Sequence, residues 1–130
     1  MLSKSNFQFV KPMKNTFNLL QVKKMICKNL IVPWKGLNIP PQEIKAQAKT
    51  IKKKIIDSIS QKGSKKIVLT TVCIKGVLNI INGLERSAAI AMISYKEIQK
   101  LDMSEINIVI IQYPKMSQTN IKNLILFNEK

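Results

Sequence analysis

The sequence predicts a two-layer α/β sandwich, in which helices pack on one sheet, and three observations lead to that class. Apolar residues make up 45% of the 130 residues, whereas aromatic residues make up only 5%. Isoleucine-rich stretches of strand length alternate with stretches in which apolar residues recur every three or four positions. No stretch reaches the ~18 consecutive apolar residues of a membrane-spanning helix. We therefore expect one aliphatic core between a sheet and its helices.

The expected order of elements is β-α-β-α-β-β, and it starts with a strand and a long helix. Residues 31–34 predict a short strand that runs into a turn. Over residues 41–61 an apolar residue recurs every three or four positions, which is typical of an amphipathic helix. Prolines 40 and 41 fit the first turn of that helix, and Gly63 is suited to end it.

The second half of the order adds a strand, a helix and a closing hairpin. Residues 66–72 are β-rich without alternation, as in a strand that is covered on both faces. Apolar and small residues at intervals of three or four predict a second helix over 74–94. A polar connector and two strands are expected to complete the chain, at 95–105, 106–111 and 121–127.

Positive charge is the strongest functional signal in the sequence. Twenty-two basic residues stand against seven acidic ones, which gives a formal net charge of +15. Such an excess repels itself in a compact fold and favours a polyanionic partner. Arg86 is the only arginine, and lysine binds phosphate as a point charge, whereas arginine reads bases through its planar fork. The composition predicts contact with the backbone of a nucleic acid rather than sequence readout.

Residue types suited to catalysis are scarce. The chain has no histidine, and its seven carboxylates are scattered. Cys27 and Cys73 lack the spacing of metal ligands and suit a reducing compartment as free thiols. No glycine-rich phosphate loop is present. We therefore expect a protein that is not an enzyme and that holds no metal or cofactor.

The N-terminal third differs from the rest in charge. Residues 1–42 contain seven lysines and no acidic residue. This pattern predicts a basic N-terminal extension over residues 1–30 and an α/β domain over residues 31–130. The acid-free, amphipathic start resembles an organelle-targeting segment, although such segments are usually rich in arginine. We expect a mitochondrial location, with the cytoplasm as the alternative.

Lysines carry the predicted binding site. Eight lysines between residues 45 and 66 stand against Asp57 alone, whereas an ordinary solvated helix mixes both signs. Trp34 is the only tryptophan and fits a core anchor better than a base-stacking platform. Arg86 fits a residue on the surface of a helix. The predicted nucleic-acid contacts are Lys23, Lys24, Lys35, Lys45, Lys49, Lys52, Lys53, Lys65, Lys66, Lys75, Lys115 and Lys122.

The order of elements resembles the Alba superfamily and its SpoVS-like branch. The resemblance is carried by the apolar helix 44–59, by Gln61-Lys-Gly63 before a strand, by Ile74-Lys-Gly76-Val-Leu, and by the small residues 87–91. It implies a fold that binds DNA or RNA and often dimerises through its second helix. It also implies nucleic-acid contacts at Lys35 and over residues 115–122.

A second segment resembles a different family. Asn82-Gly-Leu-Glu-Arg86, followed by a strand at Ile106, is similar to the Gly-x-x-Arg segment with which ParB-like proteins contact a nucleotide. Glu85 stands where that family often has histidine, and the helical periodicity runs through Gly83.

Together these features predict a non-catalytic RNA-binding protein that contacts RNA backbone through lysines. We expect a structural component of a ribonucleoprotein such as the mitochondrial ribosome, with structured RNA (rRNA) and other proteins of a large assembly as partners. A homo- or heterodimer remains open, and no transmembrane segment is expected. One alternative is a DNA-binding dimer of Alba or SpoVS type. The other is an accessory subunit of an organellar protein complex.

Overall fold

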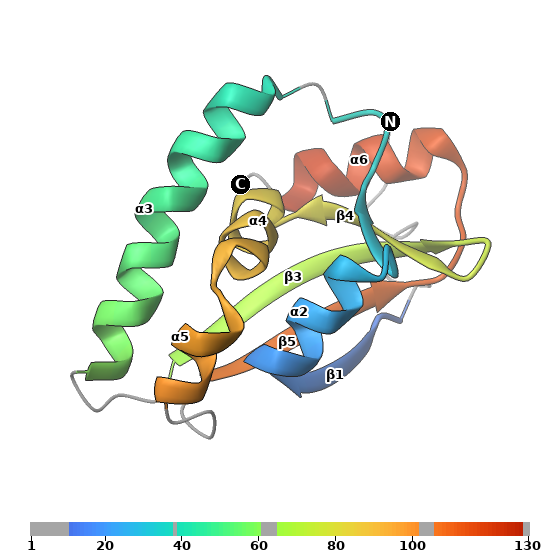
Figure 1. Ribbon diagram of the computed structural model, residues 1–130. Coiled ribbons are helices and arrows are strands. Elements are labelled where there is room, and N and C mark those ends of the chain that lie inside the picture. The colour runs from blue at the N-terminus through green and yellow to red at the C-terminus, as the bar shows by residue number, and fades with distance from the viewer. Residues whose placement is uncertain (1–10, 38, 61–64, 102–105, 129–130) are drawn as a thin grey trace.

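A computed structural model describes residues 11–37, 39–60, 65–101 and 106–128, without the side chains of 58–60, 65 and 128. Its strands form one mixed sheet in the order β1-β5-β3-β4-β2 (Figure 1). The strands are β1 (Met13–Asn18), β2 (Ile31–Pro33), β3 (Lys65–Ile74), β4 (Val77–Asn82) and β5 (Ile106–Tyr113). The helices are α2 (Leu19–Cys27), α3 (Pro41–Ser60), α4 (Leu84–Met92), α5 (Tyr95–Lys100) and α6 (Gln118–Asn128).

β3 is the central strand of the sheet. It pairs in parallel with β5, from Lys65 opposite Ile106 to Val72 opposite Tyr113, and antiparallel with β4. β1 is antiparallel to β5, and β2 is parallel to β4. The central position explains why the sequence of β3 shows no polar alternation, because a strand between two neighbours with cover on both faces has little contact with water.

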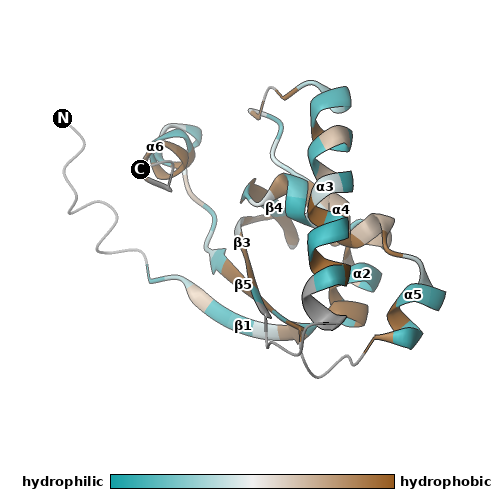
Figure 2. Ribbon diagram, turned by 90° about the vertical axis from the view of Figure 1, so that its left-hand side faces the viewer, coloured by the Kyte–Doolittle hydropathy of each residue, from teal (hydrophilic) through white to brown (hydrophobic). Residues whose placement is uncertain are grey.

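Helices α2, α3, α4 and α5 lie on one face of the sheet, which confirms the two-layer α/β class (Figures 1 and 2). The main core lies between these helices and the sheet. It includes Leu19, Ala48, Ile90, Leu69 and Ile108. Helix α6 lies on the opposite side of the sheet (Figure 2). A second, smaller cluster fills the space beneath α6, with the residues Trp34, Val72, Ile81, Ile121 and Leu124.

The expected boundary between an extension and a domain at residue 30 is wrong. Residues 13–27 form β1 and α2, which belong to the same sheet and the same core. Asn18 begins α2 with a capping box, because its side chain accepts a hydrogen bond from Gln21 N at 2.8 Å and its N–H donates to Gln21 Oε1 at 2.9 Å. Residues 1–10 lie outside the described part of the chain.

The single helix expected over 74–94 is replaced by a hairpin strand, a turn and a shorter helix. Lys75 and Gly76 have φ values of 52° and 77°, the pattern of a tight turn that joins β3 to β4. Gly83, with a φ of 93°, then separates β4 from α4. The spacing of apolar residues misled the prediction because the buried positions of β4 and α4 happen to continue one helical period.

Two further expected elements differ from the structure. Residues 95–100 of the expected connector form α5, where Ser94 Oγ accepts from Glu97 N at 3.1 Å and Ser94 N donates to Glu97 Oε1 at 3.0 Å. The expected closing strand at 121–127 is part of α6 instead. Ile121 and Leu124, three residues apart, are both buried in the second cluster, which fits one face of a helix.

Candidate nucleic-acid interface

Helix α3 presents a row of lysines to solvent. Ala48 and Ile55 are buried against the core, so the rest of the helix surface is free to carry charge. Lys45, Lys49 and Lys53 are exposed and stand four residues apart, which places them in one row along the helix. We call these three residues the α3 lysine row.

Lys52, which was predicted as a nucleic-acid contact, is held by a carboxylate instead. Its Nζ lies 3.1 Å from Glu97 Oε1, so the ion pair connects α3 to α5. The pKa of Glu97 is lowered, first by the hydrogen bond from the Ser94 backbone and then by the hydrogen bond from Lys52. At neutral pH the Lys52 ammonium is therefore paired with the ionised Glu97 carboxylate.

Lys23 does not fit its predicted role. It is only 6% exposed, and its Nζ donates a hydrogen bond to Ala91 O at 2.6 Å. The ammonium also lies 5.2 Å from the centroid of the Tyr95 ring, within reach of a cation–π contact. Lys23 therefore fastens α2 to the end of α4, whereas its neighbour Lys24 is exposed.

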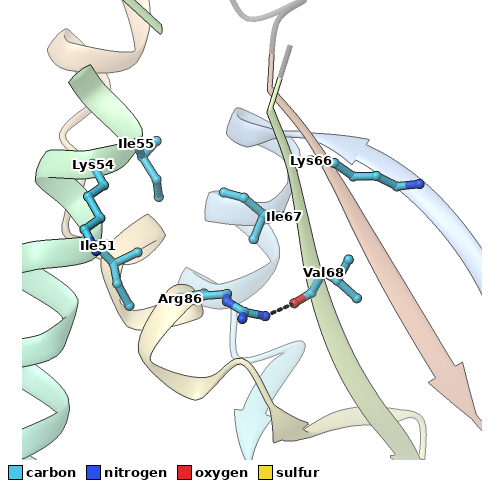
Figure 3. Close-up of a pocket in the computed structure, with 7 residues that line it drawn as sticks. All are labelled: Ile51, Lys54, Ile55, Lys66, Ile67, Val68 and Arg86. Carbon is cyan, nitrogen blue, oxygen red and sulfur yellow. Dashed lines mark hydrogen bonds between the residues drawn. The ribbon is translucent and has the colours of Figure 1, made fainter. Parts of the chain in front are cut away.

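A pocket of about 370 Å³ lies between α3, β3 and Arg86 (Figure 3). Arg86 Nη1 donates to Val68 O at 3.0 Å, on the part of β3 that β4 does not reach. Lys54 lines the pocket from α3. Lys66 also borders it, but its side chain leaves β3 on the side away from α3 (Figure 3).

Lys54 is a functional candidate that sequence reasoning missed, whereas Arg86 was raised only through the resemblance to the ParB-like segment. Lys54 was left out of the predicted contacts, and Arg86 was otherwise expected on the surface of a helix. Lys54 lies on the opposite flank of α3 from Lys49 and Lys53, toward β3, because each helical residue turns by about 100°. Its place next to the apolar positions Ile51 and Ile55 is the signal that could have found it.

The N-terminus of α4 borders a second pocket, of about 390 Å³. Gly83 precedes the helix in a left-handed conformation, and no side chain caps the helix there. Uncapped N–H groups at a helix N-terminus attract anions. Glu85 and Arg86 both line this pocket, so one carboxylate offsets part of its positive charge.

A third pocket, of about 550 Å³, brings together lysines that are distant in the sequence. Lys35, Lys115 and Lys122 all line it, from the turn after β2 and from the start of α6. Lys75 is exposed at the β3–β4 turn and lines none of these three pockets, although its neighbour Ile74 lines the third. The side chain of Lys65 lies outside the described part of the chain.

The described residues show no metal centre and no membrane-spanning helix. Among them, no three His, Cys, Asp or Glu side chains converge. Cys27 and Cys73 are both free thiols. None of the helices described is long and apolar enough to cross a membrane.

No protein-family model, curated protein or solved structure matches this chain. Charge, burial and geometry of the chain itself are therefore the basis for assigning a function.

Proposed function

We propose that this protein binds RNA without catalysing a reaction and that the α3 lysine row contacts the RNA backbone. One observation carries the proposal. The three ammonium groups of the row are exposed on one helix and form no ion pair or hydrogen bond with another described residue. On an ordinary solvated helix, lysines alternate with acidic side chains that offset their charge, whereas no acidic residue lies between Lys45 and Lys53.

The wider distribution of charge supports a polyanionic partner. Lys23 is the only cation among the described residues that is buried, and Lys52 is paired with Glu97. Most other described lysines are exposed, over α2, α3, the β3–β4 turn and the start of α6. A structural place in a ribonucleoprotein such as the mitochondrial ribosome would supply phosphate on several sides, and the acid-free stretch 1–42 favours that setting.

The test is a binding titration of labelled structured RNA by fluorescence anisotropy. The variant K45Q/K49Q/K53Q removes the row and keeps good helix formers. The matched control K28Q/K96Q/K100Q removes the same charge from exposed positions directly after α2 and on α5. At ~0.1 M salt, loss of three phosphate contacts weakens binding by about 10- to 100-fold. The control stays within about 3-fold of the wild type, because lysines that do not touch the RNA act on it only through the screened long-range field.

Other results of these binding experiments contradict the α3 interface or support an alternative function. Equal weakening in both variants contradicts the α3 interface, since net charge alone would then explain binding. Tighter binding of duplex DNA than of RNA at equal salt supports the DNA-binding dimer. Absence of binding to any nucleic acid at low salt supports an accessory subunit of a protein complex. Co-sedimentation with a ribosome-sized particle that RNase collapses tests the proposed assembly.

A second candidate function is the binding of a nucleotide at the N-terminus of α4. It is favoured by one specific observation: Gly83 holds a left-handed turn at the uncapped N-terminus of α4, three residues before Arg86, within the segment that resembles the Gly-x-x-Arg segment of ParB-like proteins. Lys54 adds positive charge in the adjoining pocket. Calorimetric titration with nucleoside triphosphates tests it. We expect Arg86→Gln to abolish binding and Arg86→Lys to weaken it, with circular dichroism as the control for folding; no heat with the wild type contradicts this function.

A further inference from the structure

The pocket beside α6 differs from the other two in having an aromatic floor. Trp34, Ile74, Met116 and Ile121 line it, and Trp34 is only 7% exposed. Trp34 N donates to Ile80 O at 3.1 Å, which holds the residue, directly after β2, against β4. Gly36 lies directly on the indole, since a Cβ there would come within 2.3 Å of Trp34 Cζ3. The indole is therefore held rigidly in the second cluster beneath Gly36, and the small part of it that borders the pocket is what a bound aromatic group can contact.

Two amides add hydrogen-bonding capacity to the same pocket. Asn79 and Gln118 both line it, from β4 and from the first residue of α6. Asn79 Nδ2 donates to Val77 O at 3.0 Å, which fixes the orientation of that amide and leaves Oδ1 as an acceptor for a ligand. Side-chain amides of this kind pair with the edges of nucleobases.

The rim of the pocket is positive. Lys35, Lys115 and Lys122 are exposed at its border, and no carboxylate lines it. The first turn of α6 contains no acidic residue, and its cap is neutral, since Ser117 Oγ accepts from Asn120 N at 3.2 Å. No negative charge therefore offsets the positive end of the helix dipole there. Phosphate is the common biological anion that suits several lysines together with a helix N-terminus.

We infer that this α6 pocket takes one nucleotide unit, with the base against the Trp34 floor and the phosphate at the three lysines. Its volume of about 550 Å³ lies within the usual range for small-molecule sites. The inference rests on the proposed function for the RNA strand that would carry the nucleotide. The α3 lysine row lies on the other side of the sheet from α6 (Figure 2), so strand binding and nucleotide binding are separable.

Fluorescence of the single tryptophan tests the inference directly. Trp34 is the only tryptophan in the chain, so a base that binds in the pocket in contact with it quenches the one indole signal. The probes are adenosine monophosphate, a five-residue oligoadenylate and inorganic phosphate. We expect both adenine probes to quench the signal and inorganic phosphate to leave it unchanged. K35Q/K115Q/K122Q should weaken quenching at least about 10-fold, because three phosphate contacts are lost, while K28Q/K96Q/K100Q responds like the wild type.

The outcomes separate this inference from the proposed function. Failure of both adenine probes to quench the wild type, or equal quenching in K35Q/K115Q/K122Q, overturns the inference. Tighter binding of the oligomer than of the monophosphate assigns the pocket to a strand, and equal binding assigns it to a free nucleotide. Quenching that survives in K45Q/K49Q/K53Q, with long RNA no longer bound, shows the two sites to be independent. Quenching by the monophosphate in a protein that binds no long RNA refutes only the proposed function.

Discussion

At the residue scale, Lys23 and Lys24 are neighbours in the sequence with opposite surroundings. Val22 and Lys23 both turn inward from α2, and the aliphatic stem of Lys23 is buried while its ammonium reaches Ala91 O. Both lysines had the same predicted role, because charge alone does not show which side of a short helix faces the core. The hydrogen bond to a helix C-terminal carbonyl is visible only in the fold.

Lys23→Met keeps the bulk of the side chain and removes the donor. Ala91 O then loses its hydrogen bond in a partly buried place, and we expect a loss of about 1–3 kcal/mol in the free energy of unfolding. Urea denaturation measures it, with the exposed neighbour in Lys24→Met as the control, expected within about 0.5 kcal/mol of the wild type. RNA affinity should stay unchanged in Lys23→Met. A clear loss of RNA affinity in fully folded Lys23→Met would show that Lys23 does contact the RNA.

Gly83 and Gly76 provide a second comparison at the residue scale. Both have positive φ values, of 93° and 77°. A Cβ on Gly83 would meet Leu69 Cδ2 at 2.8 Å and Val68 O at 3.2 Å, whereas a Cβ on Gly76 would meet nothing within 4 Å. Gly83→Ala should therefore cost about 1–3 kcal/mol from backbone strain and more from the contact with β3. Gly76→Ala should cost about 1 kcal/mol, and equal losses in thermal unfolding would contradict this account of the β4–α4 turn.

At the element scale, α5 is held in place by its cap and by one ion pair. Ser94 and Glu97 satisfy each other's backbone N–H groups, and Glu97 also binds Lys52 of α3. The hydrogen bond from the Ser94 backbone N–H contributes most to lowering the pKa of the Glu97 carboxyl. Since the pKa is lower in the folded state than in the unfolded chain, the folded state gains stability once Glu97 is ionised.

This linkage predicts a pH dependence. The stabilisation is fully present above the ordinary glutamate pKa of 4.5 and is lost as the pH falls through the lowered pKa of the folded state. In Glu97→Gln the side chain stays neutral, so the thermal midpoint should lie below that of the wild type at pH 7. The two midpoints should converge in acid. A difference between the two thermal midpoints that stays constant from pH 7 to pH 3 would show that the charge of Glu97 does not contribute to stability.

The elements with a clear periodicity or a continuous β-branched run were the ones that could be predicted. α3, β3 and β5 appear where the sequence placed them, because α3 shows one helical period over five apolar positions and β3 and β5 are strand-length runs rich in β-branched residues. The region 74–94 was wrong since apolar spacing ran unbroken through Gly83, although Lys75-Gly76 is a turn signal and Gly83 suits a left-handed residue. α6 was taken for a strand because its β-branched residues outweighed the three-residue spacing of Ile121 and Leu124. Tertiary packing decides such short segments.

At the scale of the whole molecule, composition predicted the charge of the surface but not its arrangement. The row at Lys45, Lys49 and Lys53 follows from helical spacing and could be predicted. The meeting of Lys35 with Lys115 and Lys122 could not, because it depends on α6 packing over the second cluster. The resemblances to Alba-like and ParB-like proteins stay hypotheses that binding experiments can separate.

The most direct measurement is the salt dependence of RNA binding by the wild type and by K45Q/K49Q/K53Q. Each lysine–phosphate contact adds ~0.7 to the slope of log affinity against log salt for single-stranded nucleic acid and ~0.9 for a B-form duplex. We expect the variant to lose about 2 to 3 from that slope and K28Q/K96Q/K100Q to lose less than about 1. An unchanged slope in K45Q/K49Q/K53Q would contradict the central claim that the α3 lysine row contacts the RNA backbone.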